Sequence, residues 1–210
     1  MAKIIVVHGK PGSGKTTQSK RLASLSTPEL RIVHVSAGET IRAIRTGGLA
    51  SRYTPNRINH PDMDESEKHR VVNDIMFEHV DREGAGAVVL VDGYPRYEGG
   101  LRLFLGALAD GNHTLLGCIN MEIDLQTCIF RVTERGSRRG ERITVSYENI
   151  AERYRAHESE VGKTVDVFRY LTVVKDINAA GDTEQVWELF RTAASELFDS
   201  GRLGAVARYY

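Results

Sequence analysis

Hydrophobic positions along the chain gather into five short runs, which are separated by longer polar stretches that suit helices. The runs are rich in Val, Ile and Leu, and they cover residues 4–7, 31–35, 87–91, 115–121 and 171–174. Short runs of this composition predict buried strands. Strands that alternate with helices predict an α/β fold, so we expect a five-stranded parallel sheet with helices on both faces.

In an open parallel sheet, ligands bind beyond the carboxyl ends of the strands, so the residues after each run are the candidates for chemistry. The first run leads into His8-Gly9-Lys10-Pro11-Gly12-Ser13-Gly14-Lys15-Thr16-Thr17, which fits the pattern G-x-x-x-x-G-K-[ST] of a phosphate-binding P-loop. Its glycines let backbone N–H groups wrap closely around phosphate at a helix start. We expect Lys15 to reach the terminal phosphates and a hydroxyl of Thr16 or Thr17 to help hold Mg²⁺. The stretch predicts a P-loop NTPase fold that binds a nucleoside triphosphate.

Two further strand ends carry groups that suit metal and phosphate. Asp92 ends the third run, where a carboxylate of a P-loop enzyme faces the nucleotide and holds Mg²⁺ directly or through water. Arg42 and Arg96 follow the second and third runs. Because a guanidinium binds phosphate oxygens in pairs, two of them beside a triphosphate indicate a second phosphate-bearing ligand, the acceptor.

An Arg-rich segment at 130–142 carries five arginines and two glutamates, and Arg153 lies on the helix that we expect to follow. The segment is either a solvated loop or a cover for the site. As a cover, its guanidinium groups would neutralise the oxygens of a transferring phosphoryl group and exclude water. No general base is evident in the sequence, and an acceptor that is already an anion needs none.

Two intervals are longer than a simple crossover needs, and such inserts are typical of binding flaps and lids. The first contains a predicted helix from Asp64 to about Arg82. We expect one domain over 1–200, with core segments 1–46, 87–135 and 148–200, a monophosphate-binding flap at 47–86, a short lid at 136–147 and a C-terminal tail at 201–210.

Composition narrows the classes of partner. The chain has 28 basic and 28 acidic residues and a formal net charge of zero, so no overall field favours nucleic acid or an acidic membrane. It has no apolar run long enough to span a membrane and no evident signal peptide. Cys118 and Cys128 suit small core residues of a reduced protein. We therefore expect a cytoplasmic monomer that binds small molecules.

Four segments, in order along the chain, resemble motifs of the adenylate kinase family of nucleoside monophosphate kinases, in its short-lid form. Residues 9–18 are similar to G-x-P-G-x-G-K-G-T-Q, 34–42 to H-[LIV]-S-[TA]-G-[DE]-x-[LIV]-R, and 92–96 match D-G-[FY]-P-R. Glu134-Arg135-Gly136, with Arg142 and Arg153, is similar to the lid arginines and the helix after them. Residues 178–181 resemble the loop that lies against the ATP adenine.

The resemblance implies Mg²⁺-dependent, reversible transfer of the ATP γ-phosphoryl group to a nucleoside monophosphate. It implies ATP binding by Gly9, Pro11, Gly12, Ser13, Gly14, Lys15, Thr16, Thr17, Arg131, Arg135 and Gly181. It implies monophosphate binding by Ser36, Ala37, Gly38, Arg42, Gly93, Arg96, Arg142 and Arg153. The implied catalytic residues are Lys15, Arg96, Arg135, Arg142 and Arg153, and the implied Mg²⁺ residues, partly through water, are Thr16 and Asp92.

The chain departs from the family pattern mainly where a base would be read. Thr16 stands in place of the usual Gly, and Ala37 in place of the Thr of AMP enzymes. Gly100 stands where AMP enzymes have Gln and UMP/CMP enzymes have Asn, and residues 57–63 do not match the G-x-x-[VI]-P segment of the flap. AMP is slightly favoured as acceptor, while CMP and UMP stay open.

Two other functions fit the same motifs. One is a P-loop kinase of a small hydroxyl metabolite, which would need a carboxylate base near the acceptor, and Glu39 is the nearby candidate. The other is a nucleotide-binding module with weak catalysis. The lid arginines argue against that module, since a protein that only binds nucleotide has no transferring charge to stabilise.

Overall fold

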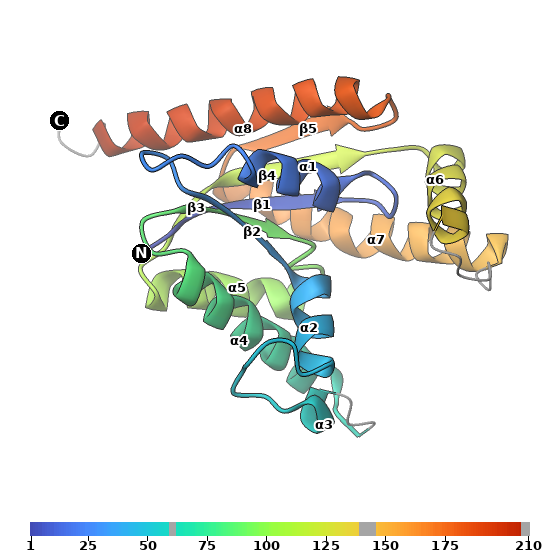
Figure 1. Ribbon diagram of the computed structural model, residues 1–210, viewed down its shortest axis with the longest axis horizontal. Helices are drawn as coiled ribbons and strands as arrows, with labels where there is room; N and C mark the ends of the chain where they lie inside the picture. The colour runs from blue at the N-terminus through green and yellow to red at the C-terminus, as the bar shows by residue number, and fades with distance from the viewer. Residues whose placement is uncertain (59–61, 139–145, 207–210) are drawn as a thin grey trace.

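The computed structural model describes the backbone of residues 1–58, 62–138 and 146–206, and the side chains in those ranges apart from 58, 135–138 and 200–206. Within them, five parallel strands form one sheet in the order β2-β3-β1-β4-β5 (Figure 1). The strands are β1 Lys3–Gly9, β2 Ile32–Ser36, β3 Val88–Asp92, β4 Thr114–Glu122 and β5 Val174–Asn178. The predicted sheet is therefore confirmed.

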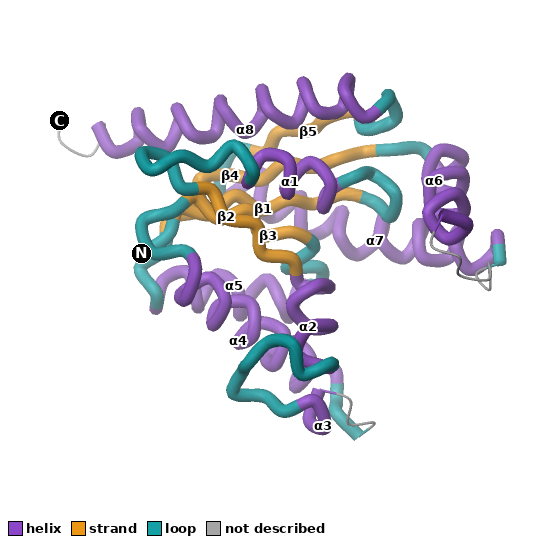
Figure 2. Tube along the Cα trace, viewed as in Figure 1, coloured by secondary structure: helices purple, strands orange, loops and turns teal. Residues whose placement is uncertain are grey.

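Helices cover both faces of the sheet (Figures 1 and 2). They are α1 Lys15–Ala23, α2 Ala37–Arg45, α3 Pro55–Ile58, α4 Glu65–Glu83, α5 Glu98–Asp110, α6 Leu125–Arg138, α7 Tyr147–Leu171 and α8 Thr183–Val206. Helices α1 and α8 lie on one face, and α4, α5 and α7 on the other. Successive residues of β1 point to opposite faces, so Ile5 and Val7 join one core cluster while Ile4 and Val6 join the other. A strand buried on both faces needs an unbroken apolar run, which β1 has.

The strand order reverses at β1. The chain passes from β1 to β2 and β3 on one side, and β4 and β5 lie on the other side. In doubly wound sheets, the crevice for ligands opens at the carboxyl end of the strand where the order reverses. The P-loop directly follows β1, so the fold places it at that crevice.

The predicted fifth strand at 171–174 is wrong in position. Helix α7 continues through Leu171, and β5 begins at Val174. Leu171 and Val173 are apolar but exposed, whereas Ile177 is the buried side chain of β5. β5 is an edge strand with polar residues at Lys175 and Asp176, so a search for apolar runs finds its flank rather than the strand itself.

The first six residues of the predicted tail 201–210 continue helix α8 to Val206, and 207–210 lie outside the described residues. A glycine inside a helix weakens it by only about 1 kcal/mol, so Gly201 does not end a helix whose earlier turns are well packed. Those turns bury Phe190, Ala194 and Leu197 in the core.

The two inserts are described to different extents. The segment 47–86, the predicted flap, contains α3 and α4, and α4 begins one residue after Asp64, whose side chain accepts a hydrogen bond from the Glu67 N–H at 2.7 Å. The helix expected there is confirmed. In the segment 136–147, the predicted lid, α6 runs to Arg138, while 139–145 lie outside the described residues. No described helix is long and apolar enough to cross a membrane.

Candidate functional site

The P-loop connects β1 to α1 through backbone that glycine allows. At Gly9 a Cβ atom would come within 2.6 Å of the Met121 carbonyl oxygen. Gly14, at φ 88°, precedes α1 and gives the helix no side-chain cap, which leaves the first N–H groups of α1 to a ligand. Lys15 Nζ donates to the Gly9 and Lys10 carbonyl oxygens at 2.5 and 3.1 Å, so its ammonium lies over the loop.

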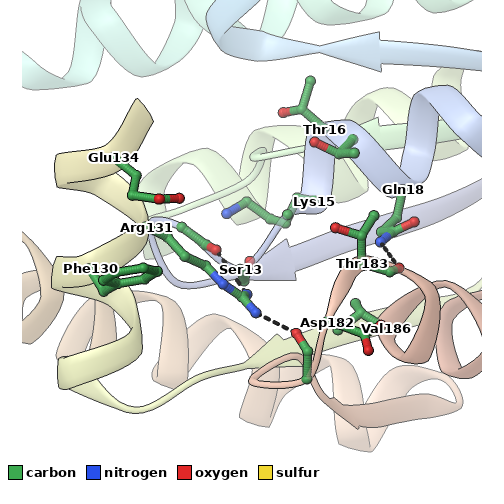
Figure 3. A pocket seen from close by; sticks show the side chains of 14 residues that line it. Ser13, Lys15, Thr16, Gln18, Phe130, Arg131, Glu134, Asp182, Thr183 and Val186 are labelled. Atoms are coloured by element: carbon green, nitrogen blue, oxygen red, sulfur yellow. Dashed lines mark hydrogen bonds between the residues drawn. The ribbon is translucent and has the colours of Figure 1, made fainter. Parts of the chain in front are cut away.

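A cavity of about 590 Å³ opens on one side of the loop (Figure 3). The loop, α6 and the start of α8 line it with Gly12, Ser13, Gly14, Lys15, Thr16, Thr17, Gln18, Phe130, Arg131, Glu134, Gly181, Asp182, Thr183 and Val186. This set contains eight of the eleven residues for which the resemblance implies ATP binding. Gly9 and Pro11 lie elsewhere on the loop, and Arg135 is placed only as a backbone position on α6.

Arg131 forms part of the wall of this cavity and joins three segments. Its guanidinium donates to the carbonyl oxygens of Gly12, Ala179, Ala180 and Gly181 at 3.3, 2.6, 3.1 and 2.5 Å. Gln18 Nε2 donates to the Thr183 carbonyl oxygen at 3.1 Å, which gives a second link between the loop side and α8. The cavity wall is therefore held together before any ligand arrives.

Thr16 and Asp92 meet at the edge of the loop. Thr16 Oγ1 donates to Asp92 Oδ2 at 2.6 Å, and His34 Nε2 lies 3.3 Å from the same oxygen. Burial by itself would raise the pKa of Asp92, but the hydrogen bonds from His34 and Thr16 and the charge of Lys15 outweigh it and lower that pKa. An ionised carboxylate beside a hydroxyl oxygen fits Mg²⁺, which prefers oxygen ligands.

No group of three His, Cys, Asp or Glu side chains among the described residues could hold a metal ion by itself. A Mg²⁺ ion at Thr16 and Asp92 would therefore draw its other ligands from substrate and water, as Mg²⁺ does in nucleotide sites.

A second cavity, of about 160 Å³, reaches the loop at Pro11, which does not line the first cavity. It is lined by Pro11, Arg96, Tyr97, Arg153, Ala156, His157, Glu160 and Val161. The structure thus brings together Arg96, which follows β3, and Arg153 of α7. Arg96 Nε donates to the Gly93 carbonyl oxygen at 2.9 Å, and its side chain remains exposed.

The other predicted acceptor residues lie near the ends of β2 and β3. Ser36 ends β2, and Ala37 and Gly38 begin α2. Arg42 is exposed on α2 and does not line the cavity of Arg96 and Arg153. A Cβ on Gly38 would lie 3.3 Å from Arg42 Nη1. The remaining predicted residue, Arg142, lies outside the described residues.

The two positions of the missing base-reading side chains are buried. Ala37 is 6% exposed and packs in the core. The Tyr94 hydroxyl lies 3.0 Å from the Gly100 carbonyl oxygen and 2.8 Å from Asn73 Oδ1. The Gly100 carbonyl and the Asn73 side-chain oxygen therefore each already have a hydrogen-bond partner. Neither Ala37 nor Gly100 offers a polar side chain to a base.

Three residues of the site were missed by sequence reasoning. Lys10 of the loop donates to the Tyr154 hydroxyl and to Glu158 Oε1 of α7 at 2.8 and 2.9 Å. His8 is buried before the loop, and His157 lines the second cavity. His157 follows Arg153 by four residues, and this spacing on a helix could have placed both on one face. No local pattern indicates the pairing of Lys10, because its partners lie more than 140 residues away.

Comparison with known proteins agrees with this geometry. A family model described as "AAA domain" matches residues 8–151, which include the P-loop, Asp92 and Arg96. The chain belongs to the AAA domain family.

Within this AAA domain chain, similarity to adenylate kinases extends over nearly the whole length. The adenylate kinase of Clavibacter michiganensis is 26% identical and covers 92% of each chain. That of Caldanaerobacter subterraneus is 24% identical and covers 90% of this chain and 95% of its own. Adenylate kinase isoenzyme 5 of Mus musculus is 28% identical over 93% of this chain and 33% of its own length. The resemblance that the motifs predict is confirmed.

Proposed function

We propose that this AAA domain protein is a nucleoside monophosphate kinase, which transfers the γ-phosphoryl group of ATP reversibly to a nucleoside monophosphate. One observation carries the proposal: the P-loop lines two separate cavities, with Gly12 to Thr17 in one and Pro11 in the other. The larger is lined by the loop, Arg131 and Gly181, and the smaller by Pro11, Arg96 and Arg153. A donor on one side and an anionic acceptor on the other would bring the transferred group to the loop itself. Similarity to adenylate kinases over more than nine tenths of the chain supports this function.

In this function, Lys15 and the loop N–H groups bind the donor phosphates, while Arg96 and Arg153 bind the acceptor phosphate. An acceptor phosphate oxygen forms the new bond to the γ-phosphorus as the bond to the β,γ-bridging oxygen breaks, and ADP leaves. The protein positions the groups and neutralises charge, as phosphoryl transfer requires. The acceptor is already an anion, so no base has to remove a proton. We assign Arg135 and Arg142 to the same task on the lid.

Magnesium is the metal that the oxygen donors favour. Thr16 and Asp92 would hold it, and a bound Mg²⁺ would neutralise charge on the donor phosphates. His34 keeps the Asp92 carboxylate ionised and oriented through the contact of 3.3 Å to Oδ2.

The residues of the site do not select one nucleobase for the acceptor monophosphate. AMP is slightly favoured by the overall resemblance, and CMP or UMP stay possible because neither Ala37 nor Gly100 can read a base through a side chain. A hydroxyl acceptor is disfavoured, because the candidate base Glu39 is bound to Lys20 Nζ at 2.7 Å and is directed into that ion pair.

A coupled assay of ADP formation, with ATP and AMP, CMP, UMP or GMP in separate reactions, tests the proposal. We expect at least one monophosphate to accelerate ADP formation well above hydrolysis, and removal of Mg²⁺ to abolish it. Acceleration by an alcohol and by no monophosphate would instead favour the hydroxyl kinase. ATP binding with no acceptor of either class would leave a nucleotide-binding module.

A further inference from the structure

His157 has a place in this site that the phosphate-binding pattern does not explain. Its side chain lines the cavity of Arg96 and Arg153, and it also lines a neighbouring cavity of about 190 Å³ that reaches Lys10 and the end of β4. Lys10 is fixed beside it by Tyr154 and Glu158, the latter being the next residue of α7. The imidazole is therefore part of the wall between the P-loop and α7.

The surroundings of His157 are rich in cations. The charged and titratable groups that face it come from the loop, the strand ends and its own helix: His8, Lys10, Lys15, Arg96, Glu122, Arg153, Glu158, Glu160, Asp166 and Arg169. Glu158 is already bound to Lys10. The cavity of Arg96 and Arg153 has one acidic lining residue, Glu160, so its two guanidinium groups outnumber the carboxylate there.

We propose that His157 is a further phosphate-binding residue of this site, neutral while the site is free of nucleotide and protonated by solvent when phosphate groups enter. The inference rests on the proposed function only in taking phosphate groups as the occupants. It does not require the acceptor to be a nucleotide.

The reason is electrostatic: phosphate groups bound in the cavity would replace the net positive charge around His157 with net negative charge. In the nucleotide-free protein, burial and then the charges of Lys15, His8, Arg96 and Lys10 lower the pKa of His157 from 6.5 to about 3. Phosphate oxygens would pair with these cations and place negative charge beside the ring, which favours the imidazolium. A protonated His157 would then donate a hydrogen bond to a phosphate oxygen, as Arg96 and Arg153 do from the other walls.

The sign of the pH dependence follows by linkage. A group whose pKa rises on binding strengthens binding below its pKa in the complex, and the gain disappears as the pH rises through that value. If the pKa in the complex returns to its ordinary value, binding gains about fourfold at about pH 6 and almost nothing at about pH 8.

Calorimetric titration with Mg²⁺ and β,γ-imido-ATP, alone and with AMP present, tests the proposal on the full chain. Runs in two buffers of different ionisation enthalpy give the number of protons taken up. We expect the wild type to take up more protons than His157→Gln at about pH 6, by about three quarters of a proton per site if the pKa in the complex returns to its ordinary value. Arg155→Gln, which removes an exposed charge from the same helix, should match the wild type. The affinity ratio of wild type to His157→Gln should fall from about fourfold at about pH 6 to near one at about pH 8.

Equal proton uptake by wild type and His157→Gln in both titrations would overturn the proposal, as would an affinity ratio that does not change with pH. The latter result would mean a structural role. If His157→Gln does not fold, the imidazole Cε1–H resonance of His157 in the wild type gives the same answer, because it should move toward the imidazolium position on adding the nucleotide analogue at about pH 6. Proton uptake without turnover of any monophosphate would contradict the proposed function and leave this inference standing.

Discussion

The two sides of the P-loop are built in different ways. On the donor side, the Arg131 guanidinium is bound to four carbonyl oxygens, and Arg21 of α1 binds Glu184 of α8 through two hydrogen bonds of 2.7 and 2.8 Å. On the acceptor side, the guanidinium groups of Arg42 and Arg153 have no hydrogen bond or ion pair to any residue that the structure describes, although the Arg42 carbonyl oxygen accepts a hydrogen bond from Thr46 Oγ1 at 3.1 Å. Arg96 is bound through Nε to a single carbonyl oxygen.

The difference teaches where ligand binding has to order the protein. On the proposed function, the donor cavity has its walls joined in advance, so a triphosphate would meet a prepared site and lose little affinity to ordering side chains. The arginines on the other side keep most of their donors for a ligand, so an acceptor phosphate would itself have to assemble them. Binding energy of the acceptor would then be used to complete the site.

Lys15→Met should have the largest effect, because Lys15 serves both sides of the loop. Its ammonium lies over the loop within reach of the transferred group, and we expect turnover to fall by at least about 100-fold. The measurement is steady-state ADP formation with Mg²⁺ and the preferred monophosphate. Lys20→Met is the matched control, since Lys20 is exposed on the same helix and paired with Glu39, and its turnover should stay within about twofold. A nearly active Lys15→Met would mean that phosphates bind elsewhere.

Arg96→Ala should separate the two sides most clearly. Loss of a guanidinium that pairs with phosphate should lower kcat/KM for the monophosphate by about 100-fold, while the Kd of β,γ-imido-ATP stays within about twofold. Steady-state kinetics and calorimetry measure the two quantities. Arg102→Ala is the control, because Arg102 is exposed on α5 and paired with Glu98. A large loss of affinity for β,γ-imido-ATP in Arg96→Ala would mean that Arg96 binds the donor and not the monophosphate.

Much of this site could be predicted because its parts are local. The P-loop, the Asp92 carboxylate at the end of β3 and the helix after Asp64 each follow from a few adjacent residues. The clamp of Arg131 could not be predicted, because its partners lie on two other segments and packing decides which of them it meets. β5 was misplaced for a related reason: Lys175 is polar and is bound to Glu196 of α8, so tertiary contacts rather than an apolar run define that strand.

Arg131→Ala should act on the donor side alone, with a smaller effect than Arg96→Ala has on the acceptor side. Removing the guanidinium leaves carbonyl oxygens of two segments, the P-loop and residues 179–181, without that donor. We expect the KM for ATP to rise by about tenfold and the free energy of unfolding to fall by about 1–3 kcal/mol. Steady-state kinetics at varied ATP concentration measure the KM, and urea denaturation measures the free energy of unfolding. Arg191→Ala is the control, because Arg191 is exposed on α8 and paired with Glu188. An equal rise in the KM for the monophosphate would contradict the separation of the two sides.

Asp176→Asn should give the smallest effect, and it tests the ion pair between β5, which leads to the donor side, and α7, which carries Arg153 of the acceptor side. Asp176 of β5 accepts two hydrogen bonds of 2.8 Å from Arg169 of α7, which lowers the pKa of its carboxyl. A lowered pKa stabilises the fold above the ordinary value, and this stability is lost as the pH falls through the lowered value. Both side chains are 44% exposed, so solvent screens the pair and we expect a loss of no more than about 1 kcal/mol at neutral pH.

Urea denaturation at neutral and strongly acidic pH measures this loss, and Asp166→Asn is the control. Asp166 lies 3.9 Å from Arg169 Nε and is 73% exposed, so its removal should change the free energy of unfolding very little. The loss in Asp176→Asn should disappear in acid, where the wild-type carboxyl is also neutral. A loss of the same size at both pH values would mean that packing, and not charge, joins β5 to α7.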